Sequence, residues 1–276
     1  MHISNIFLNW VLIFGHLGAP AMGVKGAGLA SAIAMVIGTG TYMILGMKYA
    51  REHGFLKGLG TRQEIKNLIR LSVPAGIQQL FFSAGFVAMY WIIGKVGTLE
   101  LAAANVLINI MLVALLPGLG LGLACSTLVG QAIGRGHPDD AYQWGWDVAK
   151  VAAVVMTTLG LPMLFTPDLV TMHFLHDPVT RELARWPMRL VGLWMPVEAL
   201  GFIMMHALYG AGDARRVMKI SIVFQWGLFL PAAYVIGPVL GFGLMGIWLM
   251  QGSYRILQSL TFMRYWRAGA WRELVV

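Results

Sequence analysis

A single acid lies inside a long uncharged stretch of the sequence. The stretch runs from Leu190 to Gly212, is long enough to cross a bilayer, and carries Glu198 near its middle. A carboxylate at membrane depth is unfavourable unless it is protonated, paired or hydrated, so it indicates a functional site. Pro196, just before it, removes a backbone hydrogen bond beside the acid. The alternative is a permanently neutral Glu that makes a helix–helix hydrogen bond.

One basic residue lies at a comparable depth in another apolar stretch. Arg255 is about a dozen residues into the last stretch, and Glu198 is the ninth residue of its own. If the two helices touch, an ion pair would offset both burial costs. A permanent pair would make Glu198 structural, whereas a separable pair would leave it free to exchange a cation, and Arg255 could instead snorkel to the interface. His206, two turns beyond Glu198, is a candidate proton relay or an ordinary hydrogen-bonded histidine.

Other amides in the apolar stretches are candidates for a cation or substrate cavity. Gln78 and Gln79 are adjacent, so only one of them is expected to face a cavity. Asn105 and Asn109 are four residues apart and share one helix face, where their oxygens could bind a hard cation such as Na⁺. For all four residues, hydrogen bonding between helices is the alternative.

The composition is that of a membrane protein. Of 276 residues, 58% are hydrophobic and only 12% are charged, and the mean hydropathy is +0.71, whereas a soluble domain is about 25% charged. The net charge of +8 comes from basic residues clustered between apolar runs, which favours the lipid bilayer as partner and no nucleic acid. The single cysteine, Cys125, excludes an intramolecular disulfide.

Uncharged runs long enough to span, roughly 17 to 25 residues, predict eight transmembrane helices. None of the runs alternates with period two, as the strands of a membrane barrel would. The fold class is therefore all-α, a polytopic membrane protein. The expected helices are 3–18, 26–47, 71–94, 101–124, 151–167, 190–210, 220–237 and 243–264.

The Lys and Arg residues are distributed unequally between the two sides of the membrane. One side takes fourteen and the other takes five, with Arg255 left inside the last helix. The richer side is expected to be cytoplasmic, which places the 48–70 linker and the C-terminus in the cytosol. The expected location is the inner or plasma membrane.

The linker marks a domain boundary. Gly54, Gly58 and Gly60 precede the capping-box pattern at residues 61–64, which indicates a flexible joint followed by a helix start. The expected divisions are 1–48 for two helices of a first lobe, 49–69 for the inter-lobe linker and 70–276 for a six-helix lobe.

An internal repeat supports a two-lobe organisation. Gly23 and Gly26 follow a Phe-Leu run and open a helix, and Gly243 and Gly246 do so again 220 residues later. Each copy ends a unit, so two six-helix units are expected. A complete protein would then hold twelve helices, with about 165 further residues or a second chain supplying the rest of the first lobe.

Residues 70–136 resemble the opening of the second half of multidrug and toxic compound extrusion (MATE) transporters. The matching features are Pro74, the G-x-x-G-T turn at 94–98 and the P-G-L-G-L-G run at 117–122. Residues 209–213 resemble the family's R-G-A-G-D-T loop, and residues 23–27 its sixth-helix start.

The resemblance implies an antiporter with alternating access between two lobes. It implies export of cationic or amphipathic drugs and toxic metabolites in exchange for H⁺ or Na⁺, with no cofactor beyond the coupling ion and no enzymatic activity. Glu198 lies where some branches carry an acid in the tenth helix, so any Na⁺ is expected near it. Ser83 lies where other members carry an acid, which puts their two-acid site in doubt.

Several residues in the matching motifs are expected to shape helices. Pro117, Gly118, Gly120 and Gly122 would thin and bend their helix, either for close packing or as a hinge between lobes.

Three other functions are alternatives for this sequence. A lipid-linked oligosaccharide flippase of similar architecture would line its cavity with several arginines, but only Arg255 is available here. An intramembrane enzyme would need clustered metal ligands or a nucleophile set, and motifs such as H-E-x-x-H and the phosphate-binding loop are absent from the sequence. The last alternative is a truncated membrane protein that does not transport.

Overall fold

The computed structural model is helical throughout the part of the chain that it describes. It describes residues 2–52, 54–56, 58, 61–172, 174–175 and 177–273, and no strand occurs among them. The predicted linker residues Lys57 and Gly60 lie outside these ranges. The chain divides into two compact units, Met1–Ile65 and Lys66–Val276. This boundary falls inside the expected linker, while the division into lobes stays a prediction.

The first unit is a helical hairpin. A Cβ atom added at Gly26 would lie 2.7 Å from the carbonyl carbon of Leu12, so the two helices approach closely only because this residue is glycine. The first helix was expected to continue to residue 18, but it ends at Phe14, because Gly15 adopts a positive φ of 76°. The hairpin comprises α1 (His2–Phe14), α2 (Val24–Leu45) and the π-helical turn η1 (Gly46–Ala50).

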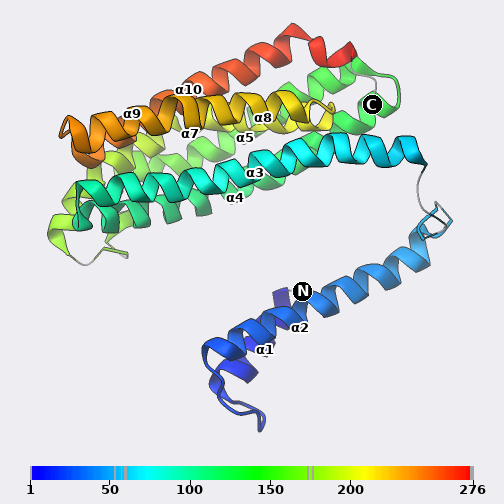
Figure 1. Cartoon of the computed structure of the whole chain (residues 1–276), viewed down its shortest axis with the longest axis horizontal. Helices are drawn as coiled ribbons and strands as arrows, with labels where there is room; N and C mark the ends of the chain where they lie inside the picture. The colour runs from blue at the N-terminus through cyan, green and yellow to red at the C-terminus, as the bar shows by residue number, and fades with distance from the viewer. Residues whose placement is uncertain are drawn as a thin grey trace. The chain divides into compact units, whose positions relative to one another are not determined.

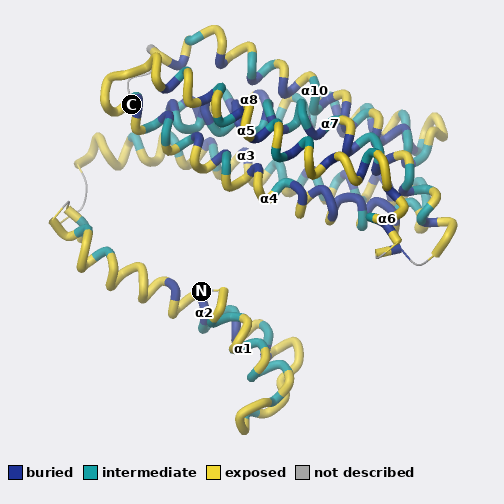
Figure 2. The backbone as a smooth tube through the Cα atoms, turned by 180° about the vertical axis from the view of Figure 1, so that it is seen from behind, coloured by how far each residue is buried: buried dark blue, intermediate teal, exposed yellow. Residues whose placement is uncertain are grey.

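The second unit is a bundle of long helices that run alongside one another (Figure 1). Helix α7 lies at its centre and packs against α4, α5 and α10, and in Figure 2 the buried positions lie along the inward faces. The elements are α3 (Arg62–Val96), α4 (Thr98–Gly134), α5 (Pro138–Phe165), α6 (Pro167–Thr171), α7 (Pro178–Gly210), α8 (Ala214–Ile222), η2 (Val223–Phe229), α9 (Leu230–Tyr234), η3 (Val235–Val239), α10 (Gly243–Ala268) and η4 (Ala270–Glu273).

Six helices in the described residues are long and apolar enough to cross a membrane. They are Val24–Ala50, Arg62–Val96, Thr98–Gly134, Pro138–Phe165, Pro178–Gly210 and Ala214–Val239. Helix α1 is shorter, and α10 is 26 residues long but carries Gln251, Arg255 and Gln258 among its apolar residues. The all-α membrane fold is confirmed.

Several helices begin well before the apolar run that predicted them. Helix α5 starts at Pro138 rather than residue 151, and α7 starts at Pro178 rather than residue 190. The expected starts were wrong because hydropathy locates the apolar part of a helix, whereas Pro at the first turn and polar caps set where the backbone becomes helical. Helix α5 also ends at Phe165, because Thr166 leaves the helical conformation.

The predicted capping box at residues 61–64 is confirmed. The backbone N–H of Thr61 donates to Glu64 Oε2 at 2.6 Å, and the Glu64 N–H donates to Thr61 Oγ1 at 3.3 Å. These reciprocal bonds satisfy N–H groups that the first turn of α3 leaves without an intrahelical partner.

Asp177 caps the N-terminus of α7. Its carboxylate accepts hydrogen bonds from the Thr180 hydroxyl at 2.5 Å and the Thr180 N–H at 2.8 Å, and these bonds lower the pKa of Asp177 below its ordinary value. The stabilisation is therefore present above the ordinary pKa and is lost as pH falls through the lowered one.

We expect Asp177→Ala to fray the first turn of α7 while leaving the bundle folded. Amide hydrogen exchange at Thr180 would measure this, with faster exchange in the variant. Asp140→Ala is the control, because this acid lies in the first turn of α5 and is not a cap. Unchanged exchange at Thr180 would contradict the capping role.

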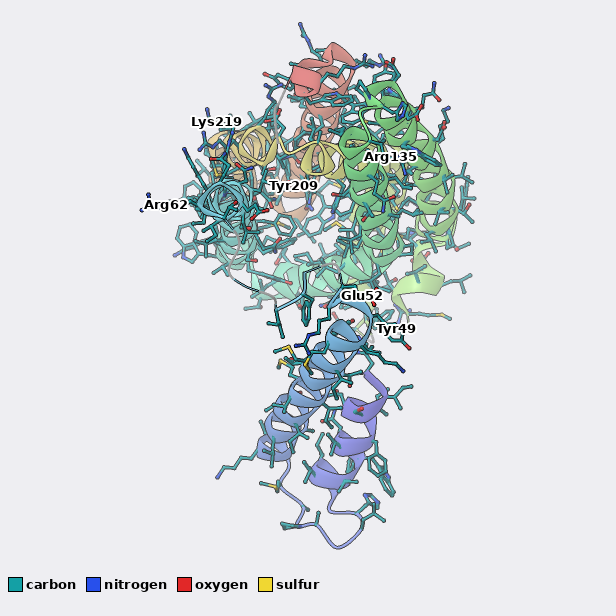
Figure 3. The ribbon with its side chains drawn as sticks, turned by 90° about the vertical axis from the view of Figure 1, so that its right-hand side faces the viewer. Tyr49, Glu52, Arg62, Arg135, Tyr209 and Lys219 are labelled. Atoms are coloured by element: carbon teal, nitrogen blue, oxygen red, sulfur yellow. The ribbon has the colours of Figure 1, made fainter. Side chains whose placement is uncertain are left out.

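Arg135 and Lys219 are two of the exposed basic residues of the second unit. Arg135 follows the end of α4, and Lys219 lies in the last turn of the short helix α8. Both side chains are exposed at the outside of the bundle, while Tyr209 lies inside it (Figure 3). Because successive long helices alternate in direction, the end of α4 and the start of α8 lie together at one end of the bundle. The multi-pass membrane character is thereby supported by chain direction as well as by hydropathy.

Candidate functional site

Glu198 and Arg255 face each other across the contact between α7 and α10. Arg255 Nε lies 3.5 Å from Glu198 Oε1, and the side chains are 17% and 13% exposed, respectively. Arg255 therefore reaches the acid and does not snorkel to the interface. The contact places the two residues at a common depth, as expected, but their distances from the helix starts differ, because α7 begins at Pro178 and Glu198 lies in its second half. The residues meet nonetheless.

Two glycines allow α7 and α10 to approach at this point. A Cβ atom on Gly201 would lie 2.6 Å from Ser259 Cα, and one on Gly252 would collide with the Trp194 ring. Gly201 is on α7 one turn after Glu198, and Gly252 is on α10 one turn before Arg255. Small residues at a helix contact let the backbones approach and bring long side chains on either side into reach.

Aromatic rings surround the guanidinium of Arg255. Its Cζ atom lies 5.4 Å from the centroid of the Tyr254 ring and 5.9 Å from that of Phe82. Rings at this distance attract a cation. Arg255 is therefore held by a carboxylate on one side and by ring faces on the other.

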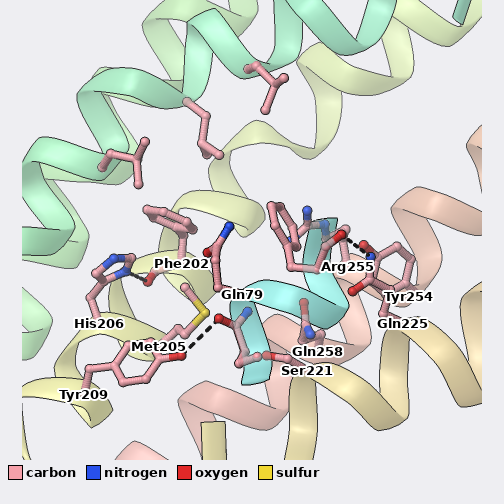
Figure 4. A pocket seen from close by; sticks show the side chains of 15 residues that line it. Gln79, Phe202, Met205, His206, Tyr209, Ser221, Gln225, Tyr254, Arg255 and Gln258 are labelled. Carbon is pink, nitrogen blue, oxygen red and sulfur yellow. Dashed lines mark hydrogen bonds between the residues drawn. The ribbon is translucent and has the colours of Figure 1, made fainter. Parts of the chain in front are cut away.

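A cavity of about 260 Å³ opens beside the pair (Figure 4). Side-chain hydrogen bonds join helix α3 to α7 and to η2 around this space. Among the described residues that line the cavity, Arg255 is the only arginine and none is acidic. The lining residues are Gln78, Gln79, Phe82, Leu112, Leu115, Leu119, Phe202, Met205, His206, Tyr209, Ser221, Gln225, Tyr254, Arg255 and Gln258.

Hydrogen bonds fix part of this lining. The Tyr209 hydroxyl donates to Gln78 Oε1 at 3.1 Å, and Gln225 Nε2 donates to the carbonyl of Phe82 at 3.3 Å. Both Gln78 and Gln79 line the cavity, so the expectation that only one would do so was wrong. The residues are adjacent, but the cavity wraps around enough of α3 for both flexible side chains to reach it.

His206 lines the same cavity but has no direct contact with the acid among the described interactions. Its Nδ1 lies 2.9 Å from the Phe202 carbonyl, which accounts for one ring nitrogen. A Cβ atom on Gly122 of α4 would lie 2.8 Å from the imidazole ring. His206 therefore packs onto a glycine surface, and its role as a proton relay stays a prediction.

The two asparagines of α4 lie elsewhere. Asn109 Nδ2 donates to the Asn105 carbonyl at 2.7 Å and the Tyr90 hydroxyl donates to Asn105 Oδ1 at 3.2 Å. Asn105, Asn109 and Ser83 are exposed in this chain and do not line the cavity. The structure does not bring these three residues together with Glu198.

The expected packing and hinge residues have different surroundings. Gly118 lies under Met156, whose sulfur would be 3.4 Å from an added Cβ, and Gly122 lies under His206, but nothing lies within 4 Å at Gly120. Close packing thus explains Gly118 and Gly122 only. Pro74 is buried, Pro196 is half-buried and Pro117 is exposed.

Apart from the tyrosines Tyr209 and Tyr254, three polar residues of the cavity were not predicted from the sequence. Gln225 lies in the π-helical turn η2, and π-helical turns occur frequently at functional sites. Gln258 lies one turn after Arg255 on α10 and shares its face, and Ser221 comes from α8. The spacing of Gln258 from Arg255 is the signal that could have revealed it.

A helical bundle that spans the membrane and holds an ion pair beside a polar cavity is typical of transport proteins. The MatE family model matches residues 74–235. The chain therefore belongs to the MatE family of membrane transporters.

Curated relatives match almost the whole chain. "Probable multidrug resistance protein NorM" of Thermotoga maritima is 29% identical over 280 residues, which cover 99% of this chain and 59% of the relative. "Uncharacterized transporter YisQ" of Bacillus subtilis is 28% identical, covering 98% of this chain and 60% of the relative. The chain thus spans about 60% of the length of these relatives.

Solved structures share the fold. An outward-facing multidrug resistance MATE family transporter of the MOP superfamily has a TM-score of 0.85 at 18% identity, covering 99% of this chain and 61% of that chain. A MOP superfamily transporter from Pyrococcus furiosus, described as having reversed polarity in its binding pocket, has a TM-score of 0.83 at 18% identity, covering 96% and 59%.

Proposed function

We propose that this chain forms part of an antiporter that exports cationic or amphipathic drugs and toxic metabolites in exchange for H⁺ or Na⁺. Family membership and relatives named as multidrug resistance proteins support export. Because the chain spans about 60% of those relatives, the activity is proposed for the assembly that includes the remaining helices, from the same chain or a second one.

The observation that carries the proposal is a single intramembrane acid beside a cavity. Of the described residues lining the three cavities around Arg255, Glu198 is the only carboxylate. An antiporter requires a group whose charge can be neutralised on one face of the membrane and restored on the other. Glu198 is the group in this lobe that can do so.

The cavity lining suits amphipathic compounds. Phe82, Phe202 and Met205 offer apolar and polarizable contacts, and Gln79 and Gln258 offer hydrogen bonds. The flippase alternative is not favoured, because Arg255 is the only arginine among the described lining residues.

The bundle end with more basic residues is proposed to face the cytoplasm. It includes Arg135 and Lys219 and follows the excess of Lys and Arg in cytoplasmic loops. This orientation would place the inter-lobe linker and the C-terminus in the cytosol.

We expect Glu198→Gln, in the full-length protein, to reduce gradient-driven drug efflux to the rate of vesicles without transporter. The amide keeps the shape but cannot exchange a proton or neutralise a cation. Efflux from proteoliposomes under an imposed H⁺ or Na⁺ gradient would measure this. Glu182→Gln is the matched control, since it changes an exposed acid on the same helix, and is expected to retain transport. Full efflux by Glu198→Gln would refute the coupling role.

A further inference from the structure

The carboxylate of Glu198 has a cation of the protein's own beside it. Arg255 Nε lies 3.5 Å from Glu198 Oε1, and both side chains lie mostly inside the bundle. Arg255 lines both the 260 Å³ cavity and a smaller cavity next to it, whereas Glu198 lines only the smaller of these two. An ion that approaches from the larger cavity therefore meets Arg255 first.

The surroundings of Glu198 hold the oxygens that a sodium ion would use. A small cavity of about 20 Å³ has Glu198, Gln258 and Ser259 in its wall, which offer a carboxylate, an amide oxygen and a hydroxyl, and Arg255 lines the same cavity. A hard cation is bound by such oxygen ligands, and the space is enough for one water-sized particle. Among the described residues there is no cluster of three acids, histidines or cysteines that would supply a second charged ligand.

We propose that Arg255 is a tethered cation that occupies the place at Glu198 where a coupling sodium ion would bind, so that this acid does not take Na⁺ while Arg255 is present. The carboxylate supplies one negative charge, which the guanidinium already balances. A Na⁺ held by Glu198, Gln258 and Ser259 would share its cavity with Arg255, and the repulsion between two positive charges at such short range opposes Na⁺ binding.

The position of Arg255 is maintained by more than the ion pair. The rings of Tyr254 and Phe82 lie within 6 Å of the guanidinium carbon, and the glycine contacts at Gly201 and Gly252 keep α7 and α10 close. A tethered group at short range has a high effective concentration, so dissolved Na⁺ competes poorly with it.

Which ion couples at Glu198 depends on the proposed function. If Glu198 is the coupling acid, the exchanged ion at this site is a proton, which bonds to a carboxylate oxygen and needs no ligand shell of its own. The guanidinium then loses its counter-charge and keeps the ring contacts with Tyr254 and Phe82. The other titratable side chains that line the adjoining cavities are Tyr254 of α10 and His206 and Tyr209 of α7.

The test is Na⁺ binding by the full-length protein in detergent, measured through the midpoint of thermal unfolding. Sodium chloride is compared with N-methylglucamine chloride at about 0.15 M. For the wild type we expect equal midpoints. For Arg255→Gln we expect a Na⁺-dependent rise of several degrees, since binding to the folded state alone stabilises it.

The controls separate charge from packing. Arg255→Lys keeps the positive charge and is expected to remain insensitive to Na⁺, and the double variant Glu198→Gln, Arg255→Gln is expected to lose the Na⁺-dependent rise. No rise in a folded Arg255→Gln variant would overturn the proposal.

A second measurement does not need the Arg255→Gln variant, so it tests the proposal even if that variant does not fold. Radiolabelled Na⁺ is added to the wild type and to Glu198→Gln. Equal, background binding by both supports the proposal, and wild-type binding that Glu198→Gln removes overturns it. Both readouts are binding, so a failed efflux prediction for Glu198→Gln leaves this test intact.

Discussion

Replacing Arg255 with alanine is expected to lower the free energy of unfolding by about 3–5 kcal/mol, because it leaves Glu198 charged and mostly buried without its partner. The Glu198–Arg255 pair joins α7 to α10 at 3.5 Å. Thermal or denaturant unfolding of the full-length protein in a Na⁺-free buffer would measure the loss.

A double-mutant cycle distinguishes the pair from simple loss of packing. Glu198→Gln removes the charge that Arg255→Ala strands, so the double variant is expected to be more stable than Arg255→Ala alone. Arg185→Ala is a matched control, because Arg185 forms ion pairs with exposed acids near the start of α7, and such pairs contribute about 0–1 kcal/mol. If the changes in free energy of unfolding caused by Glu198→Gln and Arg255→Ala simply add in the double variant, the two side chains do not interact.

Adding a methyl group at Gly201 is expected to destabilise the protein by about 2 kcal/mol and to separate the ion pair. The Cβ of Gly201→Ala would lie 2.6 Å from the backbone Cα of Ser259, so α7 and α10 must move apart. Thermal or denaturant unfolding of Gly201→Ala would measure the lost stability. In a protein that carries Gly201→Ala, the coupling energy between Glu198 and Arg255 from a double-mutant cycle is expected to be smaller.

Gly120→Ala is the control for this substitution. Nothing lies within 4 Å of an added Cβ at Gly120 on α4, and Ala in place of Gly within a helix is favourable by up to about 1 kcal/mol. We therefore expect equal or higher stability. Equal changes in the free energy of unfolding for Gly201→Ala and Gly120→Ala would contradict the close contact between α7 and α10.

Hydropathy alone predicted most of the fold. Runs without charges must form helices in a bilayer, because no water satisfies their backbone groups, and the all-α class followed from that. Helix starts were less predictable, as at Pro178 and Pro138, because caps and first-turn prolines extend a helix beyond its apolar part. The capping box at residues 61–64 was predictable because its hydrogen bonds are local.

The candidate site was predicted in part. Glu198 and Arg255 stand out in the sequence because charges are rare in apolar stretches. Asn105 and Asn109 share a face, as their spacing required, yet their hydrogen bonds are with each other and with Tyr90, away from the cavity. Spacing along one helix determines which residues are neighbours, but not which other helix that face meets.

The sequence by itself determined that this protein spans a membrane with helices and carries one acid and one arginine in its apolar segments. Whether these two charges meet was decided by the tertiary structure, through the close contact of α7 and α10 at Gly201 and Gly252. The physical reason is that an ion pair between distant segments depends on distances of a few ångströms, which helix packing sets and local sequence does not encode.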